Sequence, residues 1–126
     1  MLFRSGRVHL PGWVGNLPDW YHRAELYVMS SRFEGFPNAL VEAMSHGLPS
    51  VSFDCNTGPR DIIRPGVDGV LVTPEQGATG LAAAMGRLMG DQFLRVRMGK
   101  AASEVCERFA LERIGSLWDK VFGFVK

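Results

Sequence analysis

Apolar residues cluster in short continuous runs along the first two thirds of the chain. Continuous runs occupy residues 26–29 and 70–72, and residues 51–53 form a third apolar segment in which Val51 and Phe53 flank one serine. Runs of this kind are typical of strands covered on both faces, as in parallel sheets. A further short strand is predicted at residues 7–10, where Pro11 and Gly12 end the run.

Helical spacing of apolar residues occurs between these runs and dominates the last third of the chain. Pro18 suits the first turn of a short helix through Arg23, and a second helix is predicted from Pro37 to Gly47. One helical turn is expected at residues 61–63. Three apolar stripes then predict the final helices: Leu81, Met85 and Leu88; Leu94, Met98, Ala101 and Val105; and Leu111, Ile114, Trp118, Val121 and Phe122.

This order of elements predicts an α/β fold: a partial, Rossmann-like parallel sheet with flanking helices. No repeat or low-complexity tract divides residues 1–126, so we expect a single domain. An open sheet of three or four short strands is thin for an independent protein. We therefore expect the chain to be part of a larger one, with the sheet truncated on its N-terminal side.

Composition narrows the classes of partner. With 14 Lys and Arg against 13 Asp and Glu, the formal charge is +1, which argues against a nucleic-acid-binding protein. The apolar runs are far shorter than the roughly 20 residues that span a bilayer. Two cysteines, Cys55 and Cys106, lack metal or disulfide spacing, which favours reduced thiols and a cytoplasmic protein. His9, His22 and His46 share no ligand spacing along the chain, so no metal site is predicted.

The most informative segment follows the strand at residues 26–29. Ligands of open α/β sheets bind beyond the carboxyl ends of the strands, which is where residues 30–35 lie. Gly35 allows close approach to the backbone. The amides of Asn38, Ala39 and Leu40, at the start of the next helix, would form an anion site suited to phosphate.

Two carboxylates, Glu34 and Glu42, flank this segment. Glu42 could accept hydrogen bonds from vicinal hydroxyls such as those of a ribose. Glu34 could do the same for a sugar ring, or stabilise positive charge that develops at an anomeric carbon. The spacing alone leaves an alternative open, in which Glu34 caps the helix and Glu42 is a solvated helix residue.

The segment EGFPNALVEAM, which holds Glu34 and Glu42, resembles the E-x7-E motif of glycosyltransferase family 4. These are retaining enzymes of the GT-B fold that use nucleotide sugars. The likeness covers residues 7–124. Besides the motif, it rests on Gly12, Val14, Tyr21, Ala24, Ser31, Gly47-Leu48-Pro49, Gly58-Pro59, Ile62-Ile63 and Gly66 to Val72.

The resemblance implies that the chain is the later part of the C-terminal domain, which binds the nucleotide sugar, while an absent N-terminal domain binds the acceptor. Glu34 would contact the donor sugar and support the transition state, and Glu42 would bind the ribose hydroxyls. No metal or other cofactor is implied. The remaining expected contacts are Gly35 and Phe36 to sugar hydroxyls, Asn38, Ala39 and Leu40 to the diphosphate, and the Val14 backbone to the base.

Two departures from the family pattern lower the expected activity of these residues on their own. The family often has Gly where this chain has Pro37, and its basic pair for the diphosphate lies upstream of the residues present. We therefore expect the isolated chain to be inactive and to bind nucleotide sugar weakly. The string from Ser52 to Pro59 resembles members that transfer hexoses or N-acetylhexosamines from UDP donors to surface glycans or lipid-linked sugars. Such enzymes work in the cytoplasm or at the inner membrane face.

Other interpretations of the sequence are a non-catalytic nucleotide- or protein-binding module of the same fold, and another GT-B enzyme such as an epimerase or phosphorylase. Trp13 and Trp20 are expected to pack at the sheet edge. The aromatic residues Trp118, Phe122 and Phe124 are expected to be partly exposed, which would favour self-association.

Overall fold

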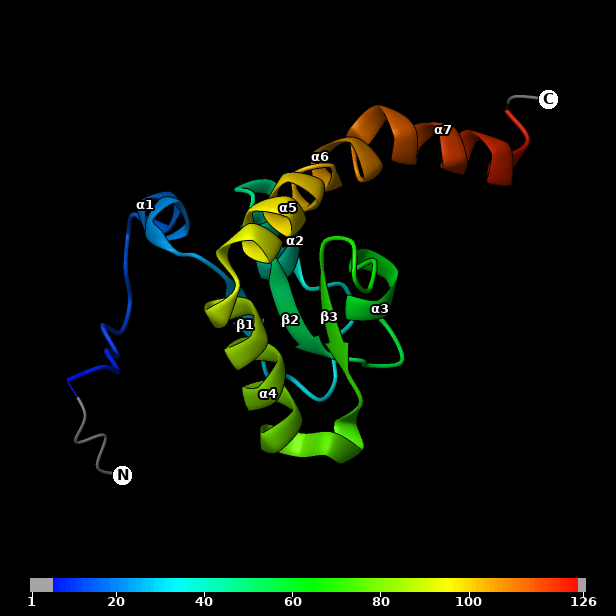
Figure 1. The fold of residues 1–126 in the computed structure, drawn as a ribbon. Coiled ribbons are helices and arrows are strands. Elements are labelled where there is room, and N and C mark those ends of the chain that lie inside the picture. Colours follow the sequence, from blue (N-terminus) through cyan, green and yellow to red (C-terminus); the bar gives the residue numbers. More distant parts are fainter. Residues whose placement is uncertain (1–5, 125–126) are drawn as a thin grey trace.

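The computed structural model describes residues 6–124. Its centre is a parallel sheet of three strands in the order β1 (Tyr27–Met29), β2 (Ser50–Phe53) and β3 (Gly69–Val72), as Figure 1 shows. Val51 of β2 lies opposite Val28 on one side and Val70 on the other. The three strands predicted from apolar segments and their parallel arrangement are confirmed.

Helices precede, connect and follow the strands. They are α1 (Leu17–Arg23), α2 (Asn38–Ser45), α3 (Pro59–Ile62), α4 (Gly77–Gly90), α5 (Gln92–Ala102), α6 (Val105–Arg108) and α7 (Leu111–Phe122), with a 3-10 turn, η1 (Pro74–Gln76), before α4. Helix α2 begins one residue later than predicted, because Pro37 has extended backbone angles and forms the N-cap. No helix within residues 6–124 is both long and apolar enough to cross a membrane.

Both faces of the sheet are covered, which explains the continuous apolar runs. On one face, side chains of β2 and β3 pack with Leu81 and Leu88 of α4 and with Met98 of α5. On the other face, Met29 packs with a second cluster: Leu40, Met44, Ile62, Ile63, Ala102 and Val105. Every residue of β2 is buried, so this strand is the centre of the core.

A buried carboxylate joins the turn before β3 to α6. Asp68 has no exposed side-chain surface. It accepts hydrogen bonds from the Arg64 amide at 2.7 Å and from Arg64 Nε at 2.6 Å. Arg108 Nη1 lies 3.1 Å from the same carboxylate, and Arg108 also donates to the Ile62 carbonyl. Asp68 therefore connects the turn at residues 64–68 to α6, 40 positions further along the chain.

The strand predicted at residues 7–10 does not form. Residues 6–10 are exposed and have no regular secondary structure, and Figure 1 shows this segment running away from the sheet. A strand is stable only when a neighbouring strand satisfies its backbone groups, and the sheet offers none there. Trp13 is 98% exposed on the same segment, so the expectation that it packs at the sheet edge is wrong.

Helix α7 extends away from the rest of the molecule in Figure 1. Trp118 and Phe122 stack with ring centroids 5.5 Å apart, and both are exposed, as is Phe124. The predicted exposure of these aromatic side chains is confirmed. Self-association through them stays a prediction.

Candidate functional site

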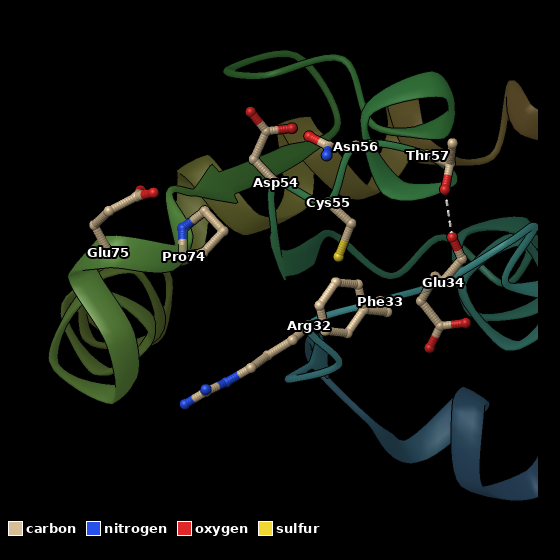
Figure 2. A pocket seen from close by; sticks show the side chains of 9 residues that line it. All are labelled: Arg32, Phe33, Glu34, Asp54, Cys55, Asn56, Thr57, Pro74 and Glu75. Atoms are coloured by element: carbon tan, nitrogen blue, oxygen red, sulfur yellow. Dashed lines mark hydrogen bonds between the residues drawn. The ribbon is translucent and has the colours of Figure 1, made fainter.

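The loops at the carboxyl ends of the three strands surround one cavity of about 330 Å³, drawn in Figure 2. Parallel α/β proteins bind ligands at this edge of the sheet. Glu34 is thus placed where the sequence predicts a binding loop. The lining residues are Arg32, Phe33, Glu34, Asp54, Cys55, Asn56, Thr57, Pro74 and Glu75.

The loop after β2 is hydrogen-bonded to the loop after β1, which carries Glu34. The Thr57 hydroxyl donates to the Glu34 carbonyl at 2.5 Å, and the Cys55 thiol donates to the Ser31 carbonyl at 3.3 Å. Figure 2 shows the first of these bonds, with the Glu34 carboxylate directed away from Thr57. The backbone at Glu34 is therefore anchored while its carboxylate stays available. Sequence reasoning missed both anchors, whose signal was a cluster of turn-forming residues directly after a strand.

Gly58 completes this contact between the two loops. It has a φ of +82°, which side chains other than that of glycine rarely tolerate. A Cβ at this position would lie 2.7 Å from the Gly35 carbonyl oxygen and 2.9 Å from Cδ of Pro37. Both the backbone angle and the close approach therefore require glycine.

Replacing Gly58 with Ala is expected to lower the free energy of unfolding by about 1–3 kcal/mol, because the new methyl group adds strain and a clash. Gly35→Ala is the matched control, since a Cβ there meets nothing within 4 Å. Urea denaturation of the two variants measures the difference. Equal stability of both variants would show that the two loops can separate at no cost.

The start of α2 presents free amides toward the same loop. Asn38 and Ala39 are exposed, and their amides have no backbone acceptor among residues 6–124. The Leu40 amide instead donates to the Pro37 carbonyl at 3.1 Å, so its predicted contact with a diphosphate would compete with this bond and stays a prediction. The N-cap carbonyl takes up the third amide of the helix, which leaves two for an anion.

The two acidic side chains are within electrostatic reach of one hydroxyl. Burial raises the pKa of the Tyr27 hydroxyl above its ordinary value, with a further contribution from Tyr21. The charges of Glu34 and Glu42 also raise this pKa. Both carboxylates therefore act on the same hydroxyl through their charge.

The alternative in which Glu34 caps the helix is wrong. No side chain caps the start of α2. Within residues 6–124, the Glu34 carboxylate takes part in no hydrogen bond or ion pair, although its carbonyl accepts one. Glu42 is exposed on α2, beside the Tyr21 hydroxyl, whose pKa is raised first by burial and then by this carboxylate.

The structure brings the other predicted residues together only in part. Gly35 and Phe36 are exposed between Glu34 and α2, and Phe36 packs edge-to-face on Phe109 at 5.4 Å between ring centroids. Val14 is half-buried in the segment before α1 and does not line the cavity.

Two further groups that line the cavity, Asp54 and Cys55, are paired or protonated. Arg60 pairs with Asp54 at 2.9 Å, and this carboxylate raises the pKa of Arg60. Burial raises the pKa of the Cys55 thiol, and Glu34 and Asp54 raise it further, so the thiol is a poor nucleophile. Among the described residues, no three or more His, Cys, Asp or Glu side chains gather as metal ligands.

A parallel sheet with helices on both faces, and a helix start with two free amides beyond its strands, is typical of the Rossmann-like class of domain. Residues 2–91 match the family described as Glycosyl transferases group 1. The chain therefore belongs to this family.

Curated relatives agree with this assignment. The chain is 40% identical over 116 residues to an exopolysaccharide phosphotransferase of Streptomyces coelicolor. This match covers 91% of this chain and 12% of that protein. The chain is 57% identical over 47 residues to a lipopolysaccharide 1,6-galactosyltransferase of Salmonella typhimurium, which covers 37% and 13%, respectively. The chain thus spans a small part of the length of each relative.

The fold is that of known GT-B enzymes. S. aureus TarM, solved in complex with fondaparinux, α-GlcNAc-glycerol and UDP, superimposes with a TM-score of 0.81 at 27% identity. The match covers 90% of this chain and 23% of TarM. The predicted fold class, an α/β parallel sheet of the GT-B type, is confirmed.

Proposed function

We propose that these residues form the donor-binding part of a retaining glycosyltransferase of family 4. The complete protein would transfer a hexose or N-acetylhexosamine from a UDP-sugar to a glycan or lipid-linked acceptor. Support comes from the group 1 family match, the galactosyltransferase among the relatives and the UDP bound to TarM. The acceptor would be held by a domain outside these 126 residues, at the cytoplasmic side of the membrane.

The observation that carries this proposal is the arrangement around the start of α2. An unpaired carboxylate, Glu34, lies on the loop before the helix, and the free amides of Asn38 and Ala39 begin it. Glu42 follows on the same helix, and the charges of both acids raise the pKa of the Tyr27 hydroxyl. This combination suits a ligand that has an anionic centre between two groups of hydroxyls, as a nucleotide sugar has.

In the proposed transfer, the bond between the anomeric carbon and the diphosphate oxygen breaks, and UDP leaves with the electron pair. An acceptor hydroxyl oxygen forms the new bond to the anomeric carbon, and its proton passes to the departing diphosphate. The two amides and the helix dipole stabilise the negative charge that the diphosphate gains. Glu34 stabilises the positive charge that develops on the sugar. Glu42 accepts hydrogen bonds from the ribose hydroxyls, Gly35 and Phe36 bind sugar hydroxyls through their backbone, and neither a metal nor another cofactor takes part.

Titration of the isolated chain with UDP, followed by amide NMR, tests the proposal. We expect weak binding with shifts at residues 34–42, weaker shifts with GDP, and a loss of binding in Glu42→Gln. Glu112→Gln on α7 is the control, because it removes the same negative charge at a position far along the chain from residues 34–42. The isolated chain should show no transfer.

Two results would count against the proposal. Shifts that are absent from residues 34–42, or that are unchanged in Glu42→Gln, would mean that α2 does not hold the nucleotide. Turnover of a UDP-sugar by the isolated chain would mean that the donor site needs no other domain.

A further inference from the structure

A second cavity lies at the opposite edge of the sheet from Glu34. It has a volume of about 260 Å³, and among its lining residues are Ala24 and Glu25 just before β1 and Leu48 and Pro49 just before β2. The proposed transfer uses none of these residues. This cavity also contains His22, from the last turn of α1, and His46, the C-cap of α2.

The structure joins two histidines that share no ligand spacing along the chain. His46 Nδ1 lies 3.3 Å from His22 Nε2, and the ring centroids are 4.8 Å apart at an interplanar angle of 83°. Tyr21, also from α1, packs on the other side of His46 with ring centroids 5.2 Å apart. Although the sequence shows no metal-ligand spacing, the fold brings the ends of α1 and α2 together and so places the two histidines side by side.

The separation of the two nitrogens matches that of two ligands on one metal ion. Imidazole nitrogens bind Zn²⁺ at about 2.0–2.1 Å, and two corners of a tetrahedron with such bonds are about 3.3–3.4 Å apart. The nitrogens belong to two different elements, and a cation between them would replace the single hydrogen that they now share. Neutral imidazole is a preferred ligand of Zn²⁺, Cu²⁺ and Ni²⁺.

Among the described residues, the one arginine that lines this cavity is paired, so it does not repel a cation at the two histidines. Arg95 lines the same cavity, but its guanidinium is neutralised by Glu25 at 2.9 Å. It also donates to the carbonyls of Leu88 and Met89, both at 2.7 Å, which holds it in place. His22 is exposed and His46 is half-buried, so solvent reaches the pair and water can fill the remaining coordination positions.

We infer that His22 and His46 form a binding site for one divalent transition-metal ion of the kind that prefers imidazole. The ion crosslinks α1 to α2 at the edge of the sheet opposite the donor cavity. With two protein ligands, the site exchanges its metal, unlike a four-ligand structural zinc site. The proposal is independent of glycosyl transfer, because it involves neither Glu34 nor the start of α2.

Calorimetric titration of the untagged chain with Zn²⁺ tests the inference in a Cys106→Ser background, which removes the exposed thiol as a competing ligand. We expect one equivalent to bind, no binding of Mg²⁺, and a higher unfolding midpoint with Zn²⁺. His22→Ala and His46→Ala should each weaken binding by roughly tenfold or more, through the loss of one of two ligands. His9→Ala, at an exposed position before α1, should leave it unchanged.

Binding that is equally tight in His22→Ala, or that weakens as much in His9→Ala, would overturn the site. So would a wild-type chain that binds no Zn²⁺. His22 is exposed on a short helix, so its variant retains the fold even if replacement of the half-buried His46 disturbs it, and circular dichroism of each variant checks this.

Discussion

Glu34→Gln is expected to lower the transfer rate of the proposed complete glycosyltransferase by about a hundred- to a thousandfold, the cost of losing one preorganised charge at a transition state. Glutamine keeps the size of the side chain and the backbone bond from Thr57, which uses the Glu34 carbonyl. What it removes is a carboxylate that no other described group pairs with. The measurement is the initial rate of sugar transfer at saturating donor.

The distribution of the effect between kcat and KM identifies the role of Glu34. Stabilisation of developing positive charge predicts a fall in kcat with little change in donor KM. Glu112→Gln on α7 should keep the wild-type rate. If Glu34→Gln retains a rate close to that of the control, the acid at this position does not support the transition state, whatever else the site binds.

Asp68→Ala is expected to lower the free energy of unfolding by about 3 kcal/mol, because it leaves Arg64 and Arg108 without the buried carboxylate that pairs with both. Asp68 itself is wholly buried, whereas Arg64 and Arg108 retain some exposure. That exposure places the expected loss at the lower end of the range for broken buried pairs. Chemical denaturation monitored by circular dichroism gives the difference.

Glu104→Ala is the matched control for this ion-pair network. Glu104 also pairs with Arg64, at 2.8 Å, but it is exposed, so its loss should cost less than about 1 kcal/mol. A similar loss of unfolding free energy in both variants would mean that the burial of Asp68 does not make its ion pairs more important for stability than the exposed pair of Glu104. Asp68→Asn keeps an acceptor for the Arg64 amide and should fall between the two.

The strands were predictable because burial on both faces leaves a direct trace in the sequence. Val51 and Phe53 face one layer of helices while Ser50 and Ser52 face the other, and all four are buried. The run at residues 7–10 has a similar pattern, yet no strand forms. The pattern records which side chains suit a sheet, but a strand also requires a neighbour for its backbone groups, which local sequence does not reveal.

The candidate site was predictable only where it follows from local geometry. Glu34 and the amides of Asn38 and Ala39 lie where a strand, loop and helix in succession must place them. Thr57 contacts Glu34 across 23 positions, and His22 meets His46 across 24. Contacts at such separations depend on how layers pack, so periodicity and spacing carry no signal for them.

Through the hydrogen bond between the two loops, Thr57 can influence the position of the Glu34 carboxylate without touching it. Thr57 holds the peptide of Glu34, so a substitution there would shift the acid without changing it. In the proposed donor site, selectivity for one sugar over another would thus be altered from a neighbouring segment, while the acid itself remains unaltered. Variants with new donor preferences are therefore best sought among residues 54–57, in libraries that leave Glu34, Glu42 and Gly58 intact.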